Sequence, residues 1–116
     1  VIAPLGIGKN NQSFNINGDI AAGAIAKSLK SRRLLLMTNV EGVLDNDKKL
    51  ISEISSEKVV ELIKNETISG GMIPKINTGL ESVNNGVRGV VIMDGSNHHS
   101  ILNEIFYDKG ARTLIR

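Results

Sequence analysis

The sequence predicts an α/β fold: a three-layer sandwich with a mostly parallel sheet and helices on both faces. Residues 33–38 and 89–94 are continuous apolar runs of strand length, which is typical of buried parallel strands. Around them lie segments in which apolar residues recur at helical spacing. Strands that alternate with helices in this way favour a parallel sheet covered by helices.

The first elements are two short strands and a helix. Residues 1–5 form an apolar run that ends at Gly6, and residues 13–16 alternate polar and apolar side chains, so each predicts a strand. Residues 21–29 are rich in alanine with apolar side chains at helical spacing, which predicts a helix. We expect the Asp19 carboxylate to cap the free N–H groups of this helix and to meet the positive end of its dipole.

The middle of the chain continues with a hairpin and a helix. A turn signal at residues 45–48 separates two apolar pairs, so we expect a small hairpin over residues 43–51. Ser55 then precedes an amphipathic segment and is the expected N-cap of a helix.

The last third repeats the alternation. Residues 68–72 contain two adjacent glycines and predict a flexible loop, after which Ile73 begins a helix that ends near Gly86. Beyond the second apolar strand, residues 99–106 predict a short amphipathic helix and residues 113–115 a closing strand.

Composition excludes several classes of protein. The 116 residues suffice for one domain, and 41% hydrophobic with 22% charged residues exclude a disordered chain. A net charge of +2 without a basic block, and only three aromatic residues, argue against a nucleic-acid partner. The absence of cysteine excludes a disulfide scaffold and fits a reducing, cytoplasmic compartment. No apolar run is long enough to span a membrane.

Polar and glycine-rich loops concentrate where an α/β fold binds ligands, beyond the carboxyl ends of its strands. These loops are residues 15–19, 38–44 and 69–75. Backbone N–H groups of such loops bind phosphate oxygens, and a lysine such as Lys75 neutralises phosphoryl charge. A stretch such as residues 15–19 is more often an N-cap with turn residues than a ligand site. For residues 69–75, an ordinary loop with a solvated lysine explains the spacing at least as well as a phosphate site, so spacing alone leaves both interpretations open. The adjacent histidines lack metal-ligand spacing, and we expect no protein ligand for a metal.

Several stretches carry a family resemblance that extends, in order, over essentially the whole chain: residues 2–6, 15–19, 21–26, 36–45, 67–75 and 104–106 with Gly110. On these stretches the chain resembles the C-terminal part of the acetylglutamate kinases, a branch of the amino acid kinase family. The Asn-Ile-Asn-x-Asp and Gly-Gly-Met-Ile-Pro-Lys stretches resemble this branch rather than the aspartate, glutamate or uridylate kinases.

The resemblance implies phosphorylation of the side-chain carboxylate of N-acetyl-L-glutamate by ATP, in arginine biosynthesis, by direct in-line transfer. Mg²⁺ is expected to be carried by the nucleotide. Asn15 is implied as a ligand of N-acetylglutamate, Asp19 as the carboxylate that orients two catalytic lysines, and Lys75 as the second of those lysines. No general base is needed, because the acceptor carboxylate is already the nucleophile.

The resemblance also implies a nucleotide site and an effector site. The adenine and ribose cradle is implied for Asn39, Val40, Glu41, Gly42, Val43, Leu44, Thr67, Ile68 and Ser69. Glu104 and Gly110 match a signature of members that arginine inhibits and are candidate effector residues. The sequence departs from the pattern at Asn39, where the family usually has aspartate, at Arg112, which replaces a small glycine, and at Val91, which replaces a histidine of the effector site.

We therefore expect residues 1–116 to be a C-terminal nucleotide-binding domain whose N-terminal half is absent. In the family that half supplies a glycine-rich loop, the first catalytic lysine and the contacts of homodimers or hexamers. The strand-like start at Val1, without a methionine, fits this expectation, and the chain alone is not expected to be a competent kinase. Two alternatives stay open: another amino acid kinase, such as a glutamate or aspartate kinase, and a non-catalytic module that senses nucleotide or arginine.

Overall fold

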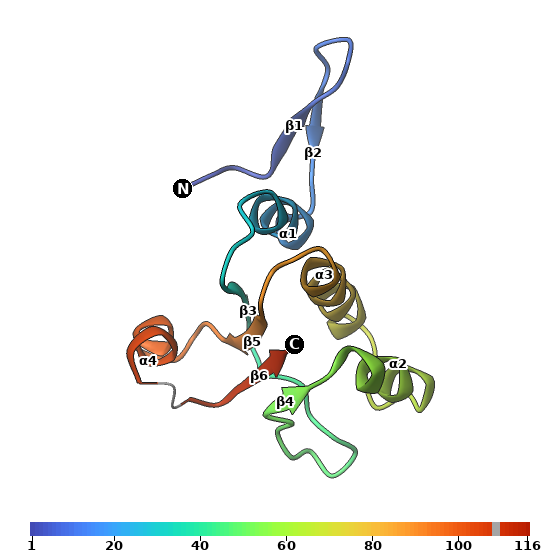
Figure 1. Ribbon diagram of the computed structural model, residues 1–116, viewed down its shortest axis with the longest axis vertical. Helices are drawn as coiled ribbons and strands as arrows, with labels where there is room; N and C mark the ends of the chain where they lie inside the picture. Colours follow the sequence, from blue (N-terminus) through green and yellow to red (C-terminus); the bar gives the residue numbers. More distant parts are fainter. Residues whose placement is uncertain (108–109) are drawn as a thin grey trace.

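The centre of the fold is a four-stranded sheet in the order β3-β5-β6-β4 (Figure 1). The computed structural model describes residues 1–107 and 110–116, and its central strands are β3 (Leu34–Thr38), β4 (Glu53–Ile54), β5 (Val90–Asp94) and β6 (Arg112–Ile115). The pairs β3–β5 and β4–β6 are parallel, and β5–β6 is antiparallel. The sheet is mixed and mostly parallel, as the sequence predicts.

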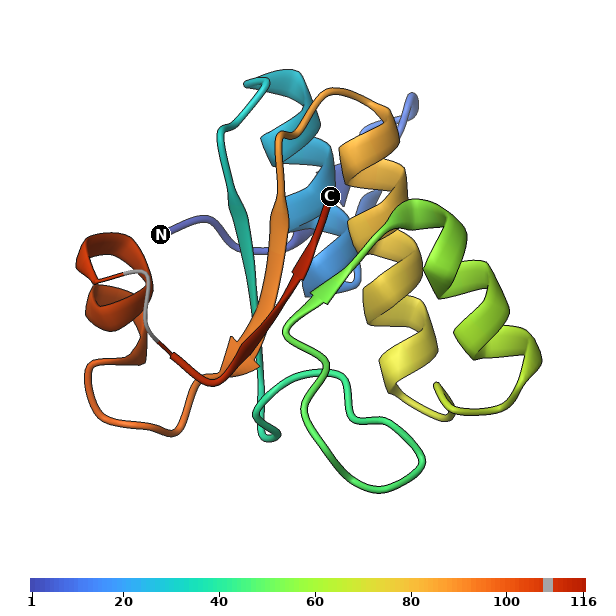
Figure 2. The ribbon, with the colours of Figure 1, turned by 60° about the horizontal axis from the view of Figure 1, so that its bottom comes forward.

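Helices cover both faces of this sheet (Figure 2). One face carries α1 (Gly18–Ser28), α2 (Ser56–Lys64) and α3 (Met72–Asn84), and the short α4 (Ser100–Phe106) lies on the other. This arrangement confirms the predicted three-layer sandwich. None of the described helices has the length and apolar character that crossing a membrane requires.

The two predicted apolar strands differ in how well they are covered. In the inner strand β5, Val90, Val91 and Ile92 are inaccessible to solvent, which explains the continuous apolar run, since successive side chains point to opposite faces. In the edge strand β3, Leu36 is buried whereas Met37 is exposed. The sheet is therefore sealed at its centre and partly open at the edge formed by β3.

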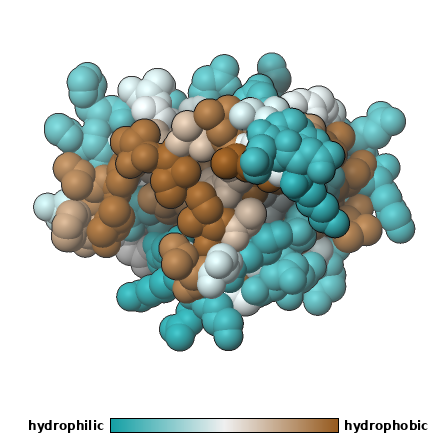
Figure 3. Space-filling model, turned by 90° about the horizontal axis from the view of Figure 1, so that it is seen from above, coloured by the Kyte–Doolittle hydropathy of each residue, from teal (hydrophilic) through white to brown (hydrophobic). Residues whose placement is uncertain are grey.

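The N-terminal strands form a separate antiparallel hairpin that projects from the rest of the molecule (Figure 1). Its strands are β1 (Leu5–Ile7) and β2 (Ser13–Asn15), so the first strand lies later than the predicted residues 1–5. The apolar side chains of Leu5, Ile7 and Phe14 are exposed on it. Figure 3 views the molecule from this end and shows apolar side chains gathered into a broad patch.

Two details of the middle segment differ from the sequence prediction. The hairpin predicted over residues 43–51 is reduced to a single bridge between Leu44 and Leu50. Strand β4 was not predicted, because two residues are too short to show any periodicity. The predicted cap of α2 is confirmed, since Ser55 Oγ accepts a hydrogen bond from the Lys58 backbone N–H at 3.4 Å.

Candidate functional site

The carboxyl ends of β3 and β5 and the first turns of α1 and α3 meet at one edge of the sheet, the lower edge in Figure 2. Parallel register places Thr38 beside Asp94, the last residues of the two strands. The Ser96 hydroxyl and backbone N–H donate to the Asp94 carboxylate at 2.7 and 2.8 Å and hold the pKa of that carboxyl below its ordinary value. This is the edge at which α/β proteins bind ligands.

Asp19 and Lys75 form an ion pair at this edge. Asp19 lies in the first turn of α1 and Lys75 in the first turn of α3, 56 positions apart in the sequence. The Lys75 Nζ donates to Asp19 Oδ1 at 3.0 Å and to Oδ2 at 2.8 Å. Their side chains are 17% and 30% exposed, so the pair is half-buried and one side of it faces solvent. The structure thus brings together the two residues for which the resemblance implies catalytic roles.

The dipoles of α1 and α3 have opposite effects on the two members of this ion pair. A carboxylate in the first turn of α1 is favoured by the positive end of the helix dipole, whereas a lysine in the first turn of α3 is disfavoured by it. The first turn of α3 contains no acidic residue to offset the lysine. Lys75 therefore occupies a position that local helix energetics oppose, and Asp19 supplies the compensating charge. Such local conflicts are expected at functional sites.

The cap of α1 is Asn17 rather than Asp19. The Asn17 Oδ1 accepts hydrogen bonds from the backbone N–H groups of Asp19 at 2.9 Å and Ile20 at 3.3 Å. The prediction that the Asp19 carboxylate caps the helix is wrong, because that carboxylate contacts Lys75 instead. The strong N-cap preference of asparagine, two positions before Asp19, is the signal that could have identified the cap.

A cavity of about 410 Å³ lies beside the ion pair. Its lining comes from the end of β3 and the start of α3: Thr38, Asn39, Val40, Gly71, Met72 and Lys75. This volume is typical of small-molecule sites. Gly71, at the N-cap position of α3, makes no side-chain cap, so the positive end of α3 faces the cavity uncapped by a side chain. Asn39 and Val40, two members of the implied nucleotide cradle, thus lie next to Lys75.

The other members of the implied cradle lie outside the described lining of that cavity: Glu41, Gly42, Val43, Leu44, Thr67, Ile68 and Ser69. Val43 and Ile68 are 2% exposed and belong to the hydrophobic core. Gly42 is also buried, and a Cβ built on it would lie 2.6 Å from Thr113 Oγ1. The Val43 backbone N–H donates to Thr113 Oγ1 at 2.8 Å, and its carbonyl oxygen accepts from the Ile51 N–H at 2.8 Å. The Ile68 N–H donates to the Leu62 carbonyl oxygen at 3.2 Å, so these backbone groups bind within the fold.

Asn15, the implied ligand of N-acetylglutamate, is the last residue of β2. Its side chain is exposed, and register pairs it with Leu5 across the hairpin. It is also the last residue of the hairpin, two positions before Asn17, the N-cap of α1. Asn15 thus lies three residues before the start of α1 along the chain. It is not among the residues that line the cavity next to Lys75.

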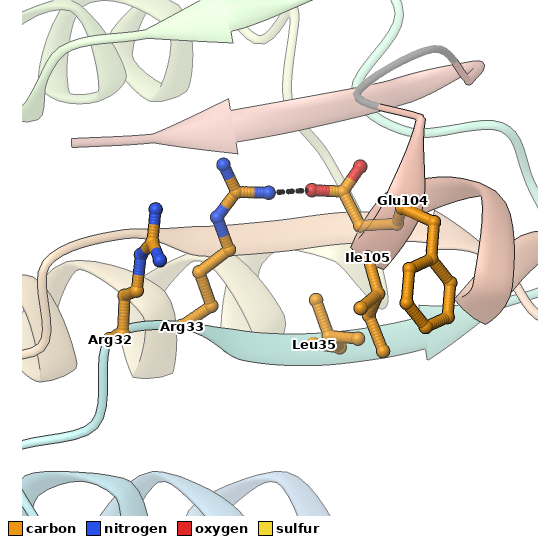
Figure 4. A pocket seen from close by; sticks show the side chains of 6 residues that line it. Arg32, Arg33, Leu35, Glu104 and Ile105 are labelled. Atoms are coloured by element: carbon orange, nitrogen blue, oxygen red, sulfur yellow. Dashed lines mark hydrogen bonds and ion pairs between the residues drawn. The ribbon is translucent and has the colours of Figure 1, made fainter.

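A second charged cluster lies on the opposite face of the sheet. The Glu104 side chain of α4 is 2% exposed and forms ion pairs with Arg33, just before β3, and with Arg112 of β6. Figure 4 shows the Arg33 guanidinium directed at the Glu104 carboxylate. The sequence did not predict this cluster, although a glutamate among the apolar residues of a short helix is a usable signal for a buried ion pair.

Two further cavities flank this cluster. The larger, about 480 Å³, lies against Arg33 and the apolar side chains of Leu35 and Ile105 (Figure 4). The other, about 330 Å³, is lined in part by Glu104 and Gly110, the candidate arginine-effector residues. Any guanidinium ligand there would compete with Arg33 and Arg112 for the Glu104 carboxylate.

Comparison with curated proteins links the chain to one kind of enzyme. It is 60% identical, over all 116 residues, to the acetylglutamate kinase of Pelagibacter ubique and covers 40% of that protein. It is 53% identical over 116 residues to the acetylglutamate kinase of Rhodospirillum rubrum and covers 37% of it. The chain thus spans about two fifths of the length of the curated relatives that it matches.

Solved structures share the fold. An N-acetylglutamate synthase from Neisseria gonorrhoeae, complexed with coenzyme A and L-arginine, aligns over 97% of this chain and 26% of its own, with a TM-score of 0.86 and 27% identity. A carbamate kinase from Giardia lamblia, bound to AMP-PNP, aligns over 94% of this chain and 36% of its own, with a TM-score of 0.72 and 22% identity, which shows a common fold. The model of the amino acid kinase family matches residues 1–94. The chain belongs to the amino acid kinase family.

Proposed function

We propose that this chain is the nucleotide-binding, C-terminal part of an acetylglutamate kinase. The whole enzyme would transfer the γ-phosphoryl group of MgATP to the side-chain carboxylate of N-acetyl-L-glutamate, in cytoplasmic arginine biosynthesis. The names and identities of the curated relatives support this assignment. The family match and the shared fold agree with it.

The observation that carries the proposal is the placement of Lys75 between a carboxylate and a cavity. A lysine ammonium group has three N–H donors. Two hydrogen bonds from Lys75 Nζ reach the two oxygens of Asp19, which leaves one N–H for a ligand. Lys75 also lines the cavity next to residues 38–40. An ATP phosphate in that cavity would meet a lysine whose orientation is already fixed.

This arrangement suits phosphoryl transfer, in which catalysis is mostly positioning and charge stabilisation. Lys75 would stabilise negative charge on the transferring group, and Asp19 would hold the lysine in place without touching the nucleotide. The uncapped start of α3 adds a positive field at the same place. The acceptor carboxylate attacks directly, so the site needs no residue that accepts a proton.

The missing parts of such an enzyme would lie in a preceding N-terminal half. Strand β3 ends the sheet order, and nearby apolar side chains of Met37, Ile105 and Phe106 are exposed. Open edges and apolar patches of this kind are usually covered. We place the N-terminal half against this surface, where it would supply the first catalytic lysine, most of the acetylglutamate pocket around Asn15 and the contacts of an oligomer.

The proposal is tested on the full gene product that contains this sequence. Acyl phosphates react with hydroxylamine to give hydroxamates, so the assay measures ATP-dependent hydroxamate formation from N-acetyl-L-glutamate, L-glutamate and L-aspartate. We expect product from N-acetyl-L-glutamate alone. Product from glutamate or aspartate alone would indicate another amino acid kinase, and ATP binding without product would indicate a sensing module.

A chimera tests whether this chain can supply the C-terminal part of an active acetylglutamate kinase. The chain replaces the matched 40% of the Pelagibacter ubique protein, to which it is 60% identical. If the proposal is right, the chimera phosphorylates N-acetyl-L-glutamate and loses that activity when Lys75 is replaced by methionine. A folded chimera that binds ATP but transfers no phosphoryl group would contradict it.

A further inference from the structure

Helices α1 and α3 lie side by side, and both begin at the candidate site (Figures 1 and 2). They meet closely at Gly23, where a Cβ would lie 2.9 Å from Thr78 Cγ2 and 3.1 Å from Ser82 Oγ. A side chain at this position would therefore require a helix to shift, or the side chains of both Thr78 and Ser82 to move. Since glycine weakens the interior of a helix relative to alanine, close approach of α3 is the physical reason for glycine here.

This contact is the middle one of three that we call the α1–α3 seam, consisting of Asp19–Lys75, Gly23–Thr78 and Lys27–Glu81. The contacts recur every four residues on α1 and every three on α3, so each follows the last by about one helical turn, or roughly 5 Å. Gly23 thus lies one turn away from the ion pair of the candidate site.

The three contacts differ in how firmly they fix the helices. Both outer contacts join flexible side chains, and in the Lys27–Glu81 pair the Glu81 side chain is 65% exposed. Exposed pairs of this kind contribute little to stability. The Gly23 contact instead sets the Thr78 side chain against the backbone of a buried residue. It is the contact of the seam that can define the separation of α1 and α3.

We propose that Gly23 is a positioning residue for phosphoryl transfer. By setting the separation of α1 and α3, it holds the Lys75 ammonium group against the Asp19 carboxylate and aims it at the transferring group. The proposal rests on the proposed function, because it assigns Gly23 a role through Lys75. Gly23 itself touches no reacting atom, and a displacement of about 1 Å at such a site can lower the rate on the order of 100-fold.

The test uses Gly23→Ala in the full gene product. We expect kcat to fall about tenfold or more, while KM for ATP and for N-acetyl-L-glutamate changes less than about threefold. In a crystal structure of the variant, Lys75 Nζ should lie beyond hydrogen-bond distance of at least one Asp19 oxygen. This structural measurement does not depend on catalytic activity.

A second substitution distinguishes positioning from general destabilisation. Thr78→Ser removes Cγ2, the atom at 2.9 Å from the added methyl group, and leaves Ser82 Oγ at 3.1 Å, a contact that a small shift of this side chain relieves. Gly23→Ala/Thr78→Ser should therefore regain kcat to within about threefold of the wild type. Lys27→Met is the matched control on the same seam. It removes the outer ion pair and should leave kcat unchanged.

The outcomes separate this proposal from the proposed function. A folded Gly23→Ala variant with unchanged kcat overturns the role of Gly23, as does a double variant that regains stability but not kcat. If the single variant does not fold, the double variant decides: a kcat within about threefold of the wild type supports the role of Gly23, and a folded double variant with a lower kcat overturns it. A wild type without acetylglutamate phosphorylation overturns the proposed function, and the distance between Lys75 and Asp19 in Gly23→Ala then still decides whether Gly23 sets that distance.

Discussion

Two carboxylates of this chain meet cations in very different surroundings, one on each side of the sheet. Glu104 is 2% exposed and is held by two guanidinium groups, from Arg33 and Arg112. Asp19 is 30% exposed and is held by the single ammonium group of Lys75, next to a cavity. A carboxylate enclosed by two cations ties α4 to the sheet, whereas a half-open pair leaves its lysine able to meet an anionic ligand. Under the proposed function, this difference in burial and in the number of cations assigns a structural role to the Glu104 cluster and a catalytic role to the Asp19–Lys75 pair.

The largest expected effect is on activity at the open pair. In the full gene product, Lys75→Met should lower kcat about 100- to 1000-fold, the cost of removing one group that stabilises transition-state charge. Steady-state kinetics with ATP and N-acetyl-L-glutamate measure this loss. Lys58→Met, which removes the exposed partner of Glu61, is the control and should keep full activity. If Lys75→Met kept wild-type kcat, the functional side of the comparison would be wrong.

The next effect is on stability at the enclosed cluster. Glu104→Gln leaves two guanidinium groups without their carboxylate and should lower the free energy of unfolding by about 3 kcal/mol. Chemical denaturation measures the difference. The matched control is Glu81→Gln, since Glu81 pairs with Lys27 at an exposed site, where about 0–1 kcal/mol is expected. Equal effects of the two substitutions would show that burial does not distinguish the clusters.

The smallest expected effect is on stability at Asn17, which caps α1 so that the Asp19 carboxylate can contact Lys75. Asn17→Ala removes the acceptor for two backbone N–H groups and should lower the free energy of unfolding by about 1 kcal/mol. Asn17→Ser should keep most of that stability, because serine is also a good N-cap. An unchanged free energy of unfolding in Asn17→Ala would contradict this division of roles, in which Asn17 caps α1 and the Asp19 carboxylate pairs with Lys75.

The layers of the fold were predictable because they follow from local patterns. Continuous apolar runs indicated β3 and β5, and helical spacing indicated α1 and α3. The antiparallel direction of β6 against β5 leaves no such pattern, since the same side chains would be buried in either direction. The shift of the first strand to β1 is also a matter of register, which depends on its partner β2.

The candidate site was predictable only in part. Loop composition singled out residues 15–19 and Lys75, and a family resemblance implied the roles of Asp19 and Lys75. The structure brings these two residues together although 56 positions separate them. The ion pairs of Glu104 with Arg33 and Arg112 were missed, because a contact between distant charged residues leaves no periodic signal. The roles of Val43 and Ile68 could not be judged from sequence, since their burial depends on how the loops pack.

The central claim is that Lys75, held by Asp19, meets a nucleotide phosphate in the cavity beside it. A crystal structure of the full gene product with MgAMP-PNP tests this claim most directly. The account predicts the γ-phosphate next to residues 38–40 and Gly71, with Lys75 Nζ within hydrogen-bond distance of both a phosphate oxygen and Asp19. A nucleotide bound with Lys75 beyond hydrogen-bond distance of every phosphate oxygen would contradict it.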